Sequence, residues 1–190
     1  MIAHEHIQKI RLKELACIFL ISMAAAMLIF LSNLIFSPSI FFIASIAILV
    51  LGMNFSVYLI RKTGVATIFY LITAILTISL FDIGVTGWKK IFVFFSAGIL
   101  FELVFLILKL EIHNLPMDII IGTSVSTAGL PFISALLLSV SLASSFPIAL
   151  INLIILAFAV GLVASVIAFI IWYHIEPTKV ILKLHYYLMS

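Results

Sequence analysis

The chain of 190 residues is 66% hydrophobic and only 9% charged, whereas soluble domains are about 45–50% apolar and about 25% charged. This composition excludes a soluble fold, because no soluble domain of this length hides so much apolar surface. The net charge of +3 comes from lysines and arginines at the ends of apolar segments. That placement favours membrane lipid as a partner, and the absence of a basic stripe excludes a duplex nucleic acid.

Long apolar windows separated by short polar breaks predict an all-α, polytopic integral membrane bundle. A helix needs about 20 apolar residues to cross the roughly 30 Å hydrocarbon layer, so the chain has room for six or seven crossings. The strands of a β-barrel would instead alternate in polarity over about ten residues. We predict six transmembrane helices, over residues 15–36, 40–59, 64–81, 91–108, 117–142 and 146–173.

The segments that flank this single domain of residues 15–173 are expected to lie at the membrane interface. Residues 1–14 carry mixed charge. After Pro177, residues 174–190 place Lys179 and Lys183 on one helical face and apolar side chains on the other, which predicts an amphipathic tail. The first window is too long for the core of a signal peptide and lacks a cleavage site, so we expect it to be retained.

The distribution of basic residues predicts the orientation. Six crossings put both termini and the 60–63 and 109–116 loops on one side, with eight of the ten basic residues: Lys9, Arg11, Lys13, Arg61, Lys62, Lys109, Lys179 and Lys183. The other side has only Lys89 and Lys90. By the positive-inside rule the basic side is cytoplasmic. We therefore expect a multi-pass plasma-membrane protein with both ends in the cytoplasm.

Polar groups in the third connection and the fourth window are the first candidates for function. The connection over residues 82–88 supplies an acid, Asp82, and an aromatic ring, Trp88, which could recognise a small polar ring or form only a turn with an interfacial tryptophan. Glu102 lies inside the fourth window, where ionisable residues are unfavourable and commonly functional. It is either a ligand-binding or coupling group, or a protonated or hydrogen-bonded structural residue.

The fifth window is the most polar of the predicted helices. It carries Asp118, Ser124 and Ser126 together with glycines and a proline. Irregular backbone at this depth requires burial in protein or contact with water, and broken helices often line transporter sites. The alternative is that the small residues only permit close helix packing.

Small residues at four-residue spacing mark the first and last windows. They are Ser22 and Ala26 in the first, and Ala157, Gly161 and Ser165 in the last. Such faces let another helix approach closely, either a helix of a partner subunit or one of the same bundle.

Motifs for hydrolysis, phosphoryl transfer and metal binding are missing from the sequence. There is no His-Glu-x-x-His pattern, acidic magnesium cluster or glycine-rich phosphate loop. The segment 122–125 does not match the Gly-x-Ser-Gly of intramembrane serine proteases. The single cysteine, Cys17, provides no disulfide framework. We therefore expect no enzyme activity, no cofactor and no metal.

The whole plan of the chain resembles the substrate-binding S components of energy-coupling-factor vitamin transporters. Residues 60–66, 98–105 and 115–126 are similar to segments of the hydroxymethylpyrimidine/thiamine type. The resemblance implies a vitamin-like ligand bound near the outer side, and docking of helix one on a transmembrane coupling subunit driven by two ATPases. The candidate ligand residues are Asp82, Trp88, Glu102, Asp118, Ser124 and Ser126.

A second hypothesis is a non-catalytic accessory or structural subunit of a larger membrane complex. The low overall polarity, the smooth faces of the first and last windows, and the interfacial ends favour it. This reading needs no ligand, and the partners would be other membrane subunits.

Overall fold

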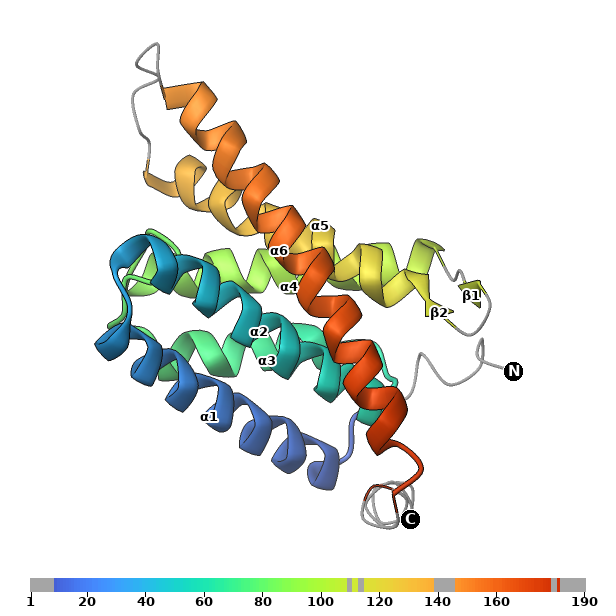
Figure 1. Ribbon diagram of the computed structural model, residues 1–190. Helices are drawn as coiled ribbons and strands as arrows, with labels where there is room; N and C mark the ends of the chain where they lie inside the picture. The colour runs from blue at the N-terminus through green and yellow to red at the C-terminus, as the bar shows by residue number, and fades with distance from the viewer. Residues whose placement is uncertain (1–8, 109–110, 113–114, 139–145, 179–180, 182–190) are drawn as a thin grey trace.

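The computed structural model describes residues 9–108, 111–112, 115–138, 146–178 and 181. These form α1 (Leu12–Ile35), α2 (Pro38–Ile60), α3 (Val65–Leu76), α4 (Trp88–Leu108), α5 (Met117–Leu138) and α6 (Phe146–Ile175). Between α4 and α5, the two-residue strands β1 (Glu111–Ile112) and β2 (Leu115–Pro116) pair antiparallel. The helical fold class is confirmed, and successive helices run in opposite directions (Figure 1).

Most of the predicted helix bounds agree closely with the structure. The bounds of α1, α2, α4 and α6 differ from the predicted ones by at most three residues. The predicted end of the fifth helix at residue 142 and most of the amphipathic tail fall outside the described residues. Helix α1 begins at Leu12, three residues before the predicted start of the first helix, and residues 1–8 of the predicted interfacial segment 1–14 lie outside the described residues.

The third helix is shorter than predicted. All the described helices except α3 are long and apolar enough to cross a membrane, which makes five such helices in that part of the chain. In contrast, α3 has 12 residues, or about 18 Å at 1.5 Å per residue, against a hydrocarbon layer of roughly 30 Å. The helix expected over 64–81 ends at Leu76, and residues 77–87 continue as turns and irregular backbone.

Two side chains of α4 explain where α3 begins and ends. Lys90 Nζ donates to the carbonyl oxygens of Thr77 at 2.6 Å and Leu80 at 3.3 Å, just past the last turn of α3. Glu102 Oε1 accepts from the backbone N–H of Ala66 at 3.2 Å, in its first turn. Lys90 and Glu102 are 12 positions apart, or about 18 Å along α4, and this distance matches the length of α3. Each charge also has the sign favoured at that end of the helix dipole.

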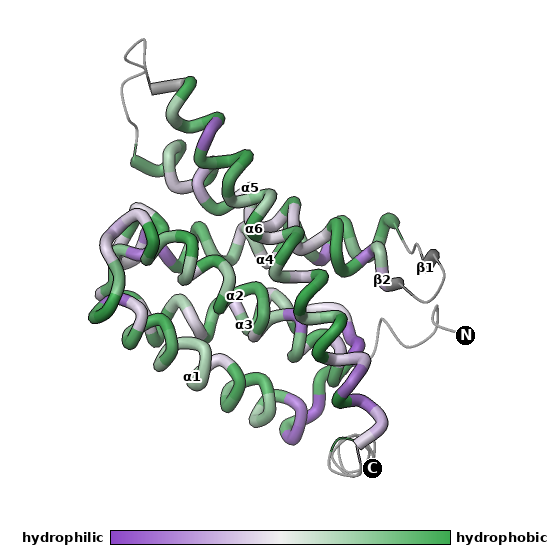
Figure 2. The backbone as a smooth tube through the Cα atoms, viewed as in Figure 1, coloured by the Kyte–Doolittle hydropathy of each residue, from purple (hydrophilic) through white to green (hydrophobic). Residues whose placement is uncertain are grey.

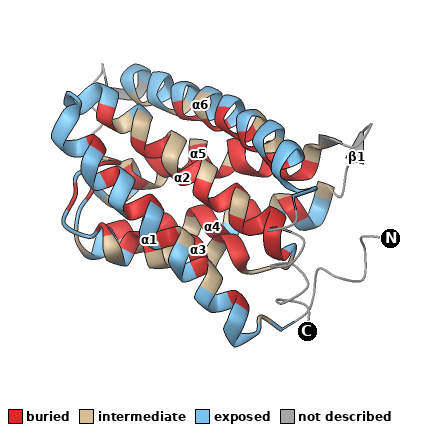
Figure 3. Ribbon diagram, turned by 60° about the horizontal axis from the view of Figure 1, so that its bottom comes forward, coloured by how far each residue is buried: buried red, intermediate tan, exposed pale blue. Residues whose placement is uncertain are grey.

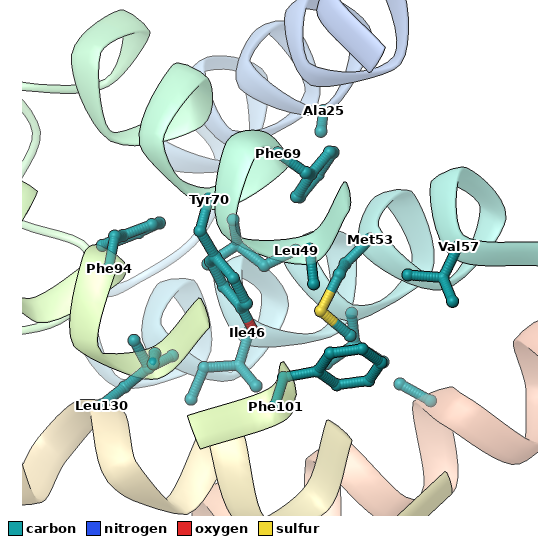
Figure 4. Close-up of a cluster of buried hydrophobic side chains, with 14 of the residues drawn as sticks. Ala25, Ile46, Leu49, Met53, Val57, Phe69, Tyr70, Phe94, Phe101 and Leu130 are labelled. Atoms are coloured by element: carbon teal, nitrogen blue, oxygen red, sulfur yellow. The ribbon is translucent and has the colours of Figure 1, made fainter. Parts of the chain in front are cut away.

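Each helix packs on the next in the order α1, α3, α4, α5, α6 and α2, which packs back on α1, and α2 also contacts α3 and α5. The interior is apolar: Figure 4 shows Phe69 and Tyr70 of α3 among side chains of α2, α4 and α5. Exposed residues run along α1 and α6 (Figure 3), and many of them are large and apolar. Polar residues concentrate near the helix ends (Figure 2).

Small and polar residues hold α2, α5 and α6 together. Asn54 Nδ2 donates to Ser165 Oγ at 2.9 Å, and Thr123 Oγ1 donates to Asn54 Oδ1 at 2.9 Å. Gly161 of α6 lies directly against Thr127 of α5, so that a Cβ at position 161 would collide with the threonine side chain. This close approach fits the small-residue packing typical of membrane helices.

The two ends of the bundle differ in their ion pairs. We call one the Glu14 end, where Lys62 Nζ pairs with Glu14 Oε1 at 2.7 Å and Arg61 lies 3.6 Å from Glu176. The other is the Asp82 end, formed by the α1–α2 connection, residues 77–87, the end of α5 and the start of α6. Asp82 and Lys90 form a buried pair there.

Candidate functional site

A cavity of about 280 Å³ lies at the Asp82 end. Its walls come from the start of α2, residues 81–84, the second half of α5 and the start of α6. Most of the lining is apolar, with Phe42, Phe81 and Leu153 as examples, whereas Asp82 and Ser134 bring polar groups to it. A mostly apolar cavity with few polar groups is the usual form of a small-molecule site.

The segment 77–87 places Asp82 in this wall. Gly84 and Gly87 have positive φ angles of 84° and 65°, which most other residues adopt only with strain. The Gly87 N–H donates to the Ile78 carbonyl at 2.9 Å, which closes the segment into a compact turn. Asp82 is consequently 1% exposed.

Asp82 and Lys90 form the only ion pair that the described residues bury completely. Asp82 Oδ1 is 2.7 Å from Lys90 Nζ, and this nitrogen also lies 5.5 Å from the centre of the Phe94 ring. Burial raises the pKa of the Asp82 carboxyl above its ordinary value, while the Lys90 ammonium acts in the opposite direction. Lys90 Nζ therefore lies within 3.3 Å of three oxygens, the Thr77 and Leu80 carbonyls and Asp82 Oδ1.

Apart from Asp82 Oδ1, which is ion-paired with Lys90, two side-chain oxygens of the lining residues make no hydrogen bond with the described part of the chain. They are Asp82 Oδ2 and Ser134 Oγ, and Ser134 is 4% exposed. Since buried polar groups almost always have a partner, such atoms call for water or a ligand. The cavity is therefore one place where the described part of the chain offers unused polar atoms, beside open space.

The structure does not bring the six predicted ligand residues together. Asp82 lines the cavity, whereas Trp88 begins α4 with 77% of its surface exposed and is not in the lining. Glu102 caps α3, as described above. The Asp118 carboxylate accepts from the Ile119 N–H at 2.9 Å in the first turn of α5, at the Glu14 end.

The two predicted serines make hydrogen bonds inside the bundle. Ser124 Oγ donates to the Ile120 carbonyl of its own helix at 2.8 Å. Ser126 Oγ donates to the Ala97 carbonyl of α4 at 2.8 Å and lies 3.2 Å from the Tyr70 hydroxyl. Both are fully buried; Ser126 joins α5 to α4, whereas Ser124 bonds only within α5.

The five residues predicted for partner docking are buried within this chain: Ser22, Ala26, Ala157, Gly161 and Ser165. Ser165 accepts a hydrogen bond from the Asn54 side-chain amide, and Gly161 packs directly against Thr127. The small-residue faces of α1 and α6 are thus turned inward. A docking subunit would meet other residues of these helices.

Three residues that matter in the structure were not identified as such from the sequence. Lys90 was used only in the count of basic residues that predicts the orientation. The opposite charge of Asp82, eight residues earlier in a short connection, is the signal that could have indicated an ion pair. Ser134 lies about two helical turns beyond Ser126, so it falls on the same face of the helix. This spacing is the one sequence signal that could have identified Ser134. Asn54 is the lone amide in the apolar α2. Among the described residues, no three metal-ligating side chains gather.

Comparisons with known protein families, curated proteins and solved structures found no match for the chain. A functional assignment therefore depends on the cavity and on the chemistry of the residues around it.

Proposed function

We propose that this protein is a membrane-embedded subunit that binds a small solute in the cavity beside Asp82, for a transporter energised by partner ATPases. The observation that carries the proposal is a mostly apolar cavity of about 280 Å³ with two unsatisfied buried oxygens in its lining residues. In the orientation that the basic residues favour, the cavity lies near the outer surface, where a solute would arrive.

In an S-component-like assembly, the partner would contact the outward face of α1. Leu20 and Met27 are each 60% exposed there and lie two turns apart. Apolar side chains of this kind suit contact with lipid and with another helix alike, so a coupling subunit would replace lipid on this face.

A different observation favours the accessory-subunit hypothesis. Glu102, Asp118, Ser124 and Ser126 all have hydrogen-bond partners within the chain. In a scaffold, polar groups of this kind serve to hold the helices together. A lipid chain that occupied the pocket would then have no functional meaning.

The test is native mass spectrometry of the protein extracted from its own membranes in mild detergent. We expect a small-molecule adduct on the wild type. It should be lost in Ala135→Phe, because the larger side chain extends from the wall and fills part of the cavity. Leu136→Phe is the matched control, because Leu136 is the next residue, is 64% exposed and does not line the cavity. It should keep the adduct.

Three results would count against solute binding. They are no adduct, an adduct that persists in Ala135→Phe, or an adduct whose mass is that of a phospholipid. Stoichiometric co-purification of ATPases would support the transporter, whereas co-purification of a different membrane complex would support the accessory role.

A further inference from the structure

The polar atoms of the cavity indicate which class of molecule it takes. Asp82 and Ser134 each line the space, are almost completely buried, and have an oxygen without a hydrogen-bond partner among the described residues. A carboxylate oxygen only accepts hydrogen bonds, and a serine hydroxyl both donates and accepts. The complement is therefore a ligand with at least one N–H or O–H donor.

The charge of the ligand follows from the state of Lys90. Its nitrogen donates to the Thr77 and Leu80 carbonyls and is ion-paired with Asp82 Oδ1, so it is already engaged and not available to hold an anion. Because Lys90 already neutralises Asp82, an anion would leave a net negative charge in this mostly apolar space, and a cation would leave a net positive one. A neutral donor satisfies Asp82 Oδ2 and adds no charge.

The remaining lining sets the size and body of the ligand. Phe42, Phe81 and Leu153 offer aromatic and aliphatic contacts only. A cavity of about 150 Å³ accommodates benzene. A cavity of about 280 Å³ therefore accommodates a ligand of up to roughly twice the volume of benzene.

We propose that the cavity beside Asp82 binds a neutral, mostly apolar and ring-sized molecule through an N–H or O–H donor to Asp82 Oδ2, with Ser134 as the second polar contact. This inference rests on the solute-binding function proposed above and gives that site its ligand class.

The probes are indole, which is neutral and carries one N–H donor, and 1-methylindole, which has the same rings without it. Binding is measured by calorimetry on the purified full chain in detergent, with detergent alone as the blank. Because 1-methylindole is the more apolar molecule, a merely hydrophobic cavity binds it at least as tightly. A hydrogen bond to the carboxylate reverses this order, and we expect indole to bind at least tenfold more tightly.

Variants connect the preference to the named atoms. Asp82→Asn should reduce the preference for indole to less than threefold, and Ser134→Ala should weaken indole binding without altering the fold. Ser124→Ala is the matched control on α5, since Ser124 bonds only its own helix in the described structure and does not line the cavity. It should leave the preference unchanged. Thermal unfolding is recorded first, and if Asp82→Asn does not fold, Ser134→Ala decides.

The outcomes separate the two proposals. Equal or tighter binding of 1-methylindole, blocked by Ala135→Phe, overturns the ligand class and leaves solute binding standing. Tighter binding of the cation tryptamine or the anion indole-3-acetate overturns the requirement for neutrality. If no probe binds and no adduct is found on the extracted protein, both proposals fail.

Discussion

Lys90→Met should be the most destabilising single substitution of a charged residue at the Asp82 end. It removes the ammonium group, which lies 2.7 Å from Asp82 Oδ1 and 2.6 Å from the Thr77 carbonyl, but keeps the length of the side chain. Breaking a buried pair by removing one partner costs about 3–5 kcal/mol, because the other charge stays buried. We therefore expect a loss of about 4 kcal/mol in the free energy of unfolding.

The double-mutant cycle isolates the ion pair from the rest of this loss. Asp82→Asn leaves Lys90 its two carbonyls and a neutral acceptor, so its expected effect is smaller, about 2 kcal/mol. In Asp82→Asn combined with Lys90→Met no charge remains buried. The combined loss should stay near 4 kcal/mol, about 2 kcal/mol less than the sum of the single effects.

The assay is unfolding by SDS titration in mixed micelles, followed by circular dichroism for the wild type, both single variants and the double variant. Lys89→Met is the control, since Lys89 is the adjacent, exposed lysine, and should change stability by less than about 0.5 kcal/mol. A Lys90→Met variant within about 1 kcal/mol of the wild type, or strictly additive single effects, would falsify the assignment of Lys90 as a buried structural cation.

Three further outcomes are expected. If Glu102 caps α3, then Glu102→Gln, which keeps an acceptor for the Ala66 N–H, should be nearly neutral in SDS unfolding, whereas Glu102→Leu should lose about 1–3 kcal/mol. Equal losses in the two variants would contradict the cap. Gly161→Ala should destabilise the bundle by about 1–3 kcal/mol through overlap with Thr127. Thr127→Ala should relieve it, and the absence of rescue would refute that contact. The preference for indole should be present at neutral pH and fall as the pH drops and Asp82 is protonated. Since burial raises the pKa of Asp82 above 3.8, the pH at which calorimetry finds half of the preference lost should lie above that value. A preference that is fully retained at pH 3.8 would contradict the role of the Asp82 carboxylate. Lys90 is the titratable group that faces Asp82 in the described structure.

Much of the helical layout could be read from the sequence, because each helix depends mainly on local properties. A window such as residues 40–59 must bury its own backbone hydrogen bonds in an apolar setting, and only a helix does so within one segment. Pro38 and the turn at Arg61 then place its ends within two residues of the prediction. The same reasoning located the first, fourth and sixth helices.

The third helix and the cavity could not be predicted in this way, because both depend on side chains from other helices. The composition of residues 64–81 is apolar enough for a longer helix. Its early end goes with Lys90 of α4, which provides donors for the freed carbonyls, and with glycines that turn the chain at 84 and 87.

The sequence by itself determined that this is a protein of apolar helices, because the solvent preference of a segment is a sum over its own residues. It also located polar residues worth testing, such as Asp82 and Glu102. Only the tertiary structure decided what each does, because a buried polar group is structural or available according to the partners that packing brings to it. One oxygen of Glu102 accepts from the start of α3, and this residue does not line the cavity, whereas Asp82 lines the cavity and has an unpaired oxygen.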